Sequence, residues 1–158
     1  NLQSVLSING VKLNKKFVYA HIKTASLYAD LSYAKRLKVG AIIVKDNRII
    51  SIGYNGTPAG WDNSCEDMVR VYENGKTELK TKPEVIHAEA NAIAKLARCH
   101  ESGESADMFV THAPCIECAK LIFTAGIKKV YYRDVYRNTD GIAFLEKCGV
   151  DIERVEDV

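Results

Sequence analysis

Residues 108–132, MFVTHAPCIECAKLIFTAGIKKVYY, carry the signals of a strand, a helix and a second strand in direct succession. Met108–Thr111 is rich in β-forming side chains, and the following stretch, Cys115–Ala125, favours a helix that ends at Gly126. Lys128–Tyr132 is again rich in β-forming residues. Two strands joined through a helix usually pair in parallel, with the helix packed on the sheet. This stretch therefore predicts an α/β fold.

The flanking sequence extends the same pattern. We expect a helix at His87–Cys99, a further helix at Thr139–Lys147 and a last strand at Val150–Val155. Nearer the N-terminus, apolar residues at helical spacing predict a helix over residues 15–34, and an antiparallel hairpin follows over residues 39–54. The fold class is thus α/β, with a mixed sheet and helices on both faces.

The segment Asn55–Glu84 shows no sustained periodicity, and we expect it to be a long irregular connection. Loops of that length in a compact domain are usually functional. The 158 residues suit one unit, so residues 1–158 are expected to form a single domain.

Composition excludes several classes of protein. Apolar residues make up 47% and charged residues 27%, which is ordinary for a globular chain. The net charge of +2 is too small to indicate a nucleic-acid partner. No apolar run approaches the roughly 20 residues that span a bilayer, and no signal-peptide pattern is visible. We expect a cytoplasmic protein that binds neither nucleic acid nor membranes.

Three side chains are good zinc ligands in this arrangement. His87 opens one predicted helix, and the i,i+3 spacing of Cys115 and Cys118 puts both sulfurs on one face of another. Helix N-termini favour thiolate over thiol. Three protein ligands leave zinc the open position of a catalytic site. Glu89 would then be a carboxylate beside that position, suited to moving protons.

These residues admit two other interpretations. A Cys-x-x-Cys pair also suits disulfide exchange, but the odd count of five cysteines and the nearby histidine favour metal binding in a reducing compartment. A structural zinc site would need a fourth protein ligand, for which His112 or Cys99 is the candidate.

The spacing of His87, Glu89 and residues 114–118 matches His-x-Glu…Pro-Cys-x-x-Cys, the signature of zinc-dependent nucleobase deaminases. From about residue 15 to the C-terminus the chain also resembles the deoxycytidylate (dCMP) deaminase family. The stretches that carry this resemblance are VGAIIV (39–44), IGYNGTPAG (52–60), HAEANAI (87–93) and AKLIFTAGIKKV (119–130).

The resemblance implies a three-layer α/β/α sandwich around a five-stranded mixed sheet, as in cytidine deaminases. It implies hydrolytic deamination of dCMP to dUMP and ammonia, in which zinc-bound hydroxide attacks C4 of cytosine. His87, Cys115 and Cys118 would be the zinc ligands and Glu89 the proton shuttle.

Substrate contacts are also implied by the resemblance. Asn55 matches an asparagine that contacts the deoxyribose, the backbone N–H of Ala88 matches a contact to the pyrimidine carbonyl, and Tyr136 matches a tyrosine that borders the nucleotide. The family further implies a hexamer, activated by dCTP and inhibited by dTTP, with Mg²⁺ accompanying the regulatory triphosphate.

A monophosphate needs cationic or N–H donors. Arg36 and Lys38, just before the first strand, are the candidates nearest along the chain, and Arg137 is another. The alternative for each is an ordinary solvated surface charge.

Some residues and rival functions stay open. His112 is unusual for the family: pocket lining is one role for it, and packing at a strand end is the one we expect. The resemblance also makes Cys65, joined by Cys99 and His100, a candidate second zinc site. The main rival function is a base deaminase acting on tRNA or single-stranded DNA. The other rival function is a zinc-stabilised binding module without catalytic activity, although such a module would not require a carboxylate at Glu89.

Overall fold

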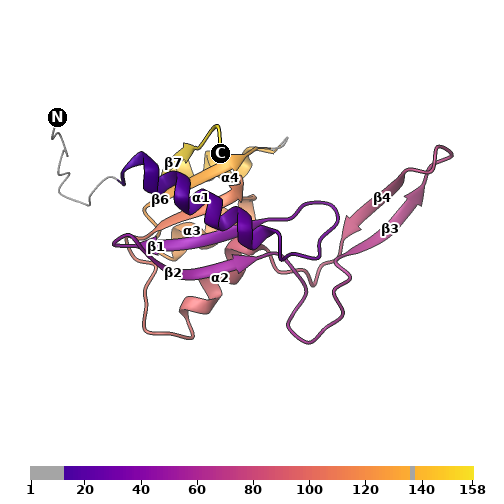
Figure 1. The fold of residues 1–158 in the computed structure, drawn as a ribbon, viewed down its shortest axis with the longest axis horizontal. Coiled ribbons are helices and arrows are strands. Elements are labelled where there is room, and N and C mark those ends of the chain that lie inside the picture. The colour runs from indigo at the N-terminus through magenta and orange to yellow at the C-terminus, as the bar shows by residue number, and fades with distance from the viewer. Residues whose placement is uncertain (1–12, 136–137) are drawn as a thin grey trace.

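The computed structural model describes residues 13–135 and 138–158. Within these residues there are four helices and seven strands (Figure 1). In chain order they are α1 (Lys15–Ala29), β1 (Gly40–Lys45), β2 (Arg48–Tyr54), β3 (Glu66–Val71), β4 (Thr77–Thr81), α2 (Ala88–Leu96), β5 (Asp107–His112), α3 (Ile116–Thr124), β6 (Lys129–Asp134), α4 (Asp140–Lys147) and β7 (Asp151–Arg154).

The main sheet has five strands in the order β2-β1-β5-β6-β7. Strand β1 is antiparallel to both β2 and β5, whereas β5, β6 and β7 run parallel to one another. One row of paired residues crosses four strands, from Ala41 through Val110 and Tyr132 to Arg154. The expected five-stranded mixed sheet is confirmed.

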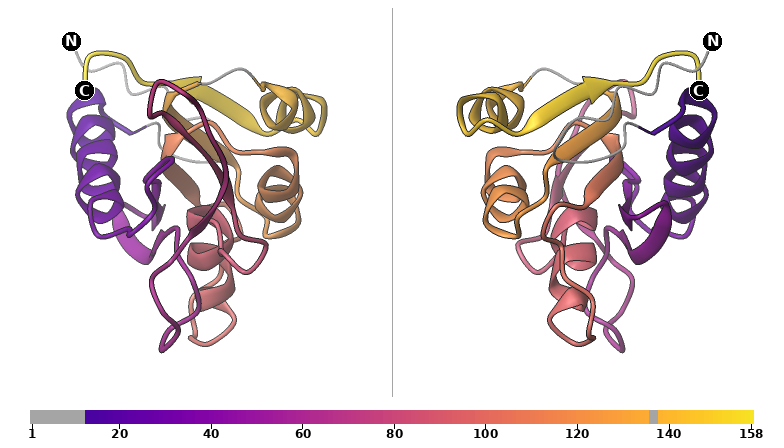
Figure 2. Two further views of the ribbon diagram at one scale, coloured as in Figure 1. Left: turned by 90° about the vertical axis from the view of Figure 1, so that its right-hand side faces the viewer. Right: turned by 90° about the vertical axis from the view of Figure 1, so that its left-hand side faces the viewer.

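Helices cover both faces of this sheet. Helix α1 lies on one side, and α2, α3 and α4 lie on the other (Figure 2). Side chains alternate along β5, so that Phe109 packs with Ile22 under α1 while Met108 and Val110 pack with Ile122 under α3. These two buried clusters are the cores of a three-layer α/β/α sandwich, as expected.

Helix α1 ends earlier than the sequence pattern suggests. We expected it to reach residue 34, but it stops at Ala29, and Leu31 beyond it is 53% exposed. Ser32 turns inward instead: it is buried, and its hydroxyl donates a 2.7 Å hydrogen bond to the carbonyl oxygen of Asn55. A tertiary contact thus overrides the local helical spacing.

The prediction of an irregular connection between Asn55 and Glu84 is wrong in part. Strands β3 and β4 form a two-stranded antiparallel hairpin that projects from the body of the molecule (Figure 1). Most of its residues are exposed on both faces. The alternation of buried and polar positions that identifies a strand in a sequence is therefore absent.

The remaining elements agree with expectation to within a few residues at each end. In the part of the chain that the structure describes, no helix combines the length and the apolar character needed to cross a membrane.

Candidate active site

The expected metal ligands lie at the starts of two helices. His87 is the N-cap of α2 and Cys115 is the N-cap of α3, and both have extended backbone conformations. Neither side chain caps its own helix. Cys118 is buried in the first turn of α3. Both helices begin on the same side of the sheet, so the three side chains converge, although 31 positions separate His87 from Cys118.

The spacing of these ligand atoms fits a zinc ion. The Nδ1 atom of His87 lies 3.6 Å from Sγ of Cys115 and 3.4 Å from Sγ of Cys118. Tetrahedral zinc with ordinary Zn–N and Zn–S bond lengths separates a nitrogen and a sulfur ligand by about 3.6 Å. All three ligand atoms lie within 4.8 Å of one another. The donor set of one imidazole and two thiolates is also the one that zinc favours.

Glu89 lies beside this cluster and is buried, with 5% of its surface exposed. Burial raises the pKa of its carboxyl above the usual value, and the nearby positive charge of His87 opposes that rise only in part. A carboxyl with a raised pKa holds or releases a proton closer to neutral pH, which is what general acid–base catalysis requires.

The two thiols differ in ionisation in the metal-free protein. Hydrogen bonds from Cys118 and then from His87 lower the pKa of Cys115 to about 3. The same hydrogen bond raises the pKa of Cys118, and its burial adds to the rise. The contact with Cys115 raises the pKa of His87. The cluster thus carries its thiolate on Cys115 next to an imidazole.

Polar contacts fasten α2 to the edge strand β2. The hydroxyl of Ser51 donates to the carbonyl oxygen of Ala92 at 2.6 Å, and the Nδ2 of Asn91 donates to that of Tyr54 at 3.1 Å. Asn91 follows His87 by one helical turn. These contacts hold the first turn of α2, and with it the imidazole and Glu89, against the sheet.

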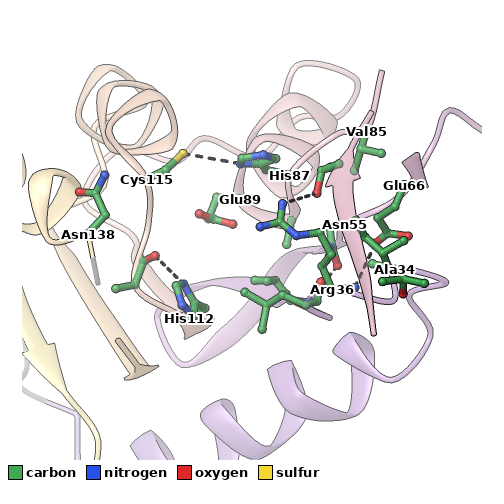
Figure 3. Close-up of a pocket in the computed structure, with 17 residues that line it drawn as sticks. Ala34, Arg36, Asn55, Glu66, Val85, His87, Glu89, His112, Cys115 and Asn138 are labelled. Carbon is green, nitrogen blue, oxygen red and sulfur yellow. Dashed lines mark hydrogen bonds between the residues drawn. The ribbon is translucent and has the colours of Figure 1, made fainter. Parts of the chain in front are cut away.

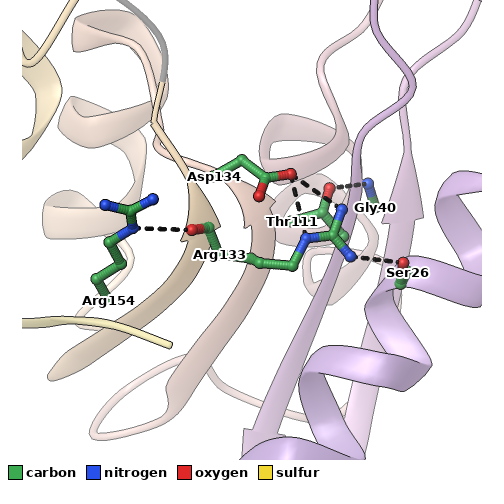
Figure 4. Close-up of polar contacts among 6 residues, drawn as sticks. All are labelled: Ser26, Gly40, Thr111, Arg133, Asp134 and Arg154. Atoms are coloured by element: carbon green, nitrogen blue, oxygen red, sulfur yellow. Dashed lines mark hydrogen bonds and ion pairs between the residues drawn. The ribbon is translucent and has the colours of Figure 1, made fainter. Parts of the chain in front are cut away.

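The segment that leads into α3 is held by the end of β6. The backbone N–H of Ala113 donates to the carbonyl oxygen of Asp134 at 2.7 Å. Arg133 anchors that end of β6, because its guanidinium donates to Ser26 Oγ at 2.8 Å and to the carboxylate of Asp134 (Figure 4). Gly141 in α4 lies so close to the Pro114 carbonyl oxygen that a Cβ would overlap it. Gly141 was not among the residues predicted from the sequence, although a glycine inside a helical pattern indicates close packing.

A pocket of about 580 Å³ opens beside the cluster, within the usual size range of small-molecule sites (Figure 3). Among the expected residues, Asn55, Ala88 and Arg36 line it together with His87, Glu89 and Cys115. Lys38, the second expected phosphate ligand, does not line this pocket but a separate groove with Asp30 and Tyr33. Tyr136 and Arg137 lie outside the described residues.

Most of the residues in the outer wall of the pocket were not predicted from the sequence. The additional lining residues include Glu66, Thr77, Leu79 and Thr81 of the β3–β4 hairpin, and Asn138 before α4. His112 also lines the pocket, and its Nδ1 lies 2.9 Å from the carbonyl oxygen of Ala113. Nothing in the sequence marked the hairpin residues as lining the pocket, because their positions depend on a strand pairing that the sequence pattern did not predict.

The side chain of Asn55 makes two hydrogen bonds to the backbone of the loop that precedes β1. Its Oδ1 accepts from the N–H of Val39 and its Nδ2 donates to the carbonyl oxygen of Leu37, both at 2.8 Å. The amide carries a second N–H on Nδ2 and a second lone pair on Oδ1, which are the groups suited to a ligand.

The alternative metal sites are not formed. Among residues 13–135 and 138–158, His87, Cys115 and Cys118 are the only group of three or more potential ligands close enough to share an ion, and neither His112 nor Cys99 joins them. Cys65 is buried with Ala34 and Val85 rather than beside Cys99 and His100. The cluster thus has the three ligands of an open site.

Comparisons with known proteins agree with this geometry. Residues 14–134 match the model of the cytidine and deoxycytidylate deaminase zinc-binding region. The chain is 34% identical to deoxycytidylate deaminase of Enterobacteria phage T4 over 169 residues, which cover 85% of this chain and 87% of the phage protein. It is 39% identical over 131 residues to ComE operon protein 2 of Bacillus subtilis, covering 82% of this chain and 66% of that protein.

Solved structures show the same relationship. The dCMP deaminase of cyanophage S-TIM5, crystallised with dCMP and dUMP, superimposes with a TM-score of 0.80 at 45% identity, covering 91% of this chain and all of that one. A tRNA adenosine-34 deaminase superimposes with a TM-score of 0.58 at 23% identity, which indicates a common fold only.

A three-layer sandwich with a His/Cys/Cys centre and a buried glutamate at two helix starts defines the class of zinc-dependent deaminases. Within that class, the chain belongs to the cytidine and deoxycytidylate deaminase family.

Proposed function

We propose that this protein deaminates dCMP to dUMP and ammonia, using a zinc ion held by His87, Cys115 and Cys118. The observation that carries the proposal is the buried carboxyl of Glu89, which lies beside the three ligands in a pocket that also contains Arg36. The 45% identity to a deaminase crystallised with dCMP and dUMP supports this choice of substrate.

When bound, zinc supplies a Lewis acid that lowers the pKa of water towards about 7. Glu89 moves the protons one at a time: its carboxylate accepts a proton from the attacking water and passes it to the ring nitrogen, then accepts the remaining proton of the hydroxyl added at C4 and passes it to the amine, which leaves as ammonia. Its raised pKa suits both roles. Because Glu89 is not one of the three clustered ligands, its carboxyl stays available for proton transfer.

Other lining residues would orient the nucleotide. Ala88 is the first residue of α2, and the N–H groups of a first helical turn have no partner within the helix. Its N–H is therefore a donor for the pyrimidine carbonyl. The second N–H of Asn55 suits a deoxyribose hydroxyl. Arg36 supplies the charge for the 5′-phosphate, and its planar guanidinium can donate two parallel hydrogen bonds. Tyr136 is a further proposed neighbour of the nucleotide.

Ammonia release from the zinc-loaded protein tests the proposal. The substrates are dCMP, deoxycytidine, cytidine, dCTP and a tRNA anticodon stem-loop. We expect kcat/KM to be highest for dCMP, with deoxycytidine lower by about 100-fold because it lacks the charge-assisted contacts of the phosphate. Faster turnover of the stem-loop than of dCMP would favour the nucleic-acid deaminase instead.

Regulation and assembly belong to the same proposal. The resemblance to dCMP deaminases supports a hexamer that dCTP activates and dTTP inhibits, with Mg²⁺ bound to the triphosphate. Sigmoidal dCMP kinetics that become hyperbolic on addition of dCTP would support regulation, and hyperbolic kinetics that neither triphosphate changes would contradict it. Sedimentation of the zinc-loaded protein tests the hexamer. A cytoplasmic location stays a prediction.

A further inference from the structure

The β3–β4 hairpin supplies one wall of the active-site pocket. Glu66 of β3 and Thr77, Leu79 and Thr81 of β4 line it, although most of the hairpin is solvent-exposed. Figure 3 shows Glu66 next to Arg36 and Asn55, on the opposite side of the pocket from Asn138. The hairpin therefore reaches the end of the pocket that holds Arg36.

Arg36 is held by both strands of this hairpin. The Oε1 of Glu66 accepts hydrogen bonds from the backbone N–H of Lys35 at 2.8 Å and from that of Arg36 at 3.1 Å. At the other end of the residue, Nη1 donates to the hydroxyl oxygen of Thr81 at 3.2 Å. The backbone of Arg36 and its guanidinium are thus both tied to the hairpin.

Arg36 also differs in charge from the other residues that line the pocket. Of the described residues that line it, Arg36 is the only lysine or arginine. A free arginine side chain would lose rotamer entropy on being fixed by a phosphate. A guanidinium that is already fixed before the anion binds loses less rotamer entropy. The residues that fix Arg36 therefore strengthen the binding of an anion to it.

We propose that Glu66 is a positioning residue for phosphate recognition. Through the backbone of Lys35 and Arg36 it aims the guanidinium at the 5′-monophosphate, and the hydrogen bond to Thr81 fixes the guanidinium itself. The hairpin is thus the element that selects phosphorylated substrates. This inference rests on the proposed deamination of dCMP.

The test compares KM for dCMP and kcat/KM for deoxycytidine in zinc-loaded variants. Glu66→Ala removes both backbone contacts, and we expect KM for dCMP to rise about tenfold with kcat nearly unchanged. Glu66→Gln keeps an acceptor oxygen and should stay close to wild type. Deoxycytidine has no phosphate, so its turnover should be the same in all variants. Asp67→Ala, at an exposed neighbouring position of β3, is the matched control.

A double-mutant cycle shows whether Glu66 acts through Arg36. In an Arg36→Ala background, Glu66→Ala should produce no further rise in KM for dCMP. Thr81→Val removes the hydroxyl with little change of shape and should raise KM for dCMP in the same direction, by about fivefold or less. This variant keeps the test decisive if Glu66→Ala lowers stability.

Equal losses of dCMP and deoxycytidine turnover in Glu66→Ala, or additive effects of Glu66→Ala and Arg36→Ala, would overturn the inference. So would an unchanged KM for dCMP in both Glu66→Ala and Thr81→Val. If wild type does not deaminate dCMP, the proposed function itself fails, and that result is visible before any variant is measured.

Discussion

Gly53 of β2 lies directly against the backbone of Ala88, the residue between His87 and Glu89. A methyl group added at Gly53 would overlap the carbonyl oxygen of Ala88 and would lie 2.7 Å from the amide nitrogen of Ala92. The absence of a side chain in an edge strand therefore determines how closely the catalytic helix α2 approaches the sheet.

Gly53→Ala should accordingly disturb the metal centre. The methyl group would push α2 outward, and we expect a loss of about 1–3 kcal/mol in the free energy of unfolding together with weaker zinc retention. Chemical denaturation and zinc analysis after dialysis measure the two effects. Gly56→Ala is the matched control, because a Cβ at Gly56 meets nothing within 4 Å. Equal behaviour of the two variants would contradict the packing argument.

Glu89→Ala should retain zinc and lose turnover. In the proposed mechanism the carboxyl transfers protons, and it is not one of the clustered ligands, so we expect kcat to fall by about 10²–10⁴-fold with one zinc still bound. Turnover assays and metal analysis on the same sample provide the measurement. Glu117→Gln changes an exposed carboxylate in α3 and should leave both properties unchanged. Near-normal activity of Glu89→Ala would mean that the mechanism is wrong.

The metal-free protein should have an unusually reactive Cys115. Its pKa of about 3 makes it a thiolate throughout the neutral range. Alkylation by iodoacetamide should therefore hardly accelerate between pH 6 and 8, whereas an ordinary thiol reacts about tenfold faster per pH unit below its pKa of about 8.5. Peptide mapping locates the label. Added zinc should block the reaction, and a rate that climbs steeply with pH would refute this assignment of the thiolate.

The ionised carboxylate of Asp107 should lower the free energy of unfolding at neutral pH. Burial raises the pKa of its carboxyl from 3.8, an effect that Lys128 at 3.9 Å offsets only in part. The folded state therefore favours the protonated form, so the contribution is favourable below pH 3.8 and is lost as the pH rises through the folded-state pKa.

Asp107→Asn should then raise the free energy of unfolding at pH 7 by an amount on the order of 1 kcal/mol, with little effect at pH 3. Denaturation curves at several pH values measure the difference. Asp151→Asn alters an exposed carboxylate that pairs with Lys129 and should not stabilise the protein. A lower stability of Asp107→Asn at pH 7 would show that the ion pair with Lys128 outweighs the effect of burial.

Local sequence patterns were enough to predict the elements of the main sheet and the three side chains that cluster as candidate metal ligands. The β5–α3–β6 stretch has strong apolar and helical signals, and its parallel pairing follows from the helical connection. His87 with Glu89, and Cys115 with Cys118, form two separate motifs, and each is recognisable because the chemistry requires particular residue types at a short spacing within the motif. These properties depend on neighbouring residues only, so a single sequence contains them.

Tertiary structure alone decided the outer half of the pocket. The hairpin β3–β4 is exposed on both faces and therefore leaves no hydrophobic pattern in the sequence. Its pairing nevertheless brings Glu66 and Thr81 to Arg36, residues 30 and 45 positions apart along the chain. Lys38, only two residues from Arg36, lines a different groove. The sequence by itself determined the chemistry of the clustered His87, Cys115 and Cys118 side chains, whereas long-range contacts decided which charged residue lines the pocket, because sequence distance does not measure distance in space.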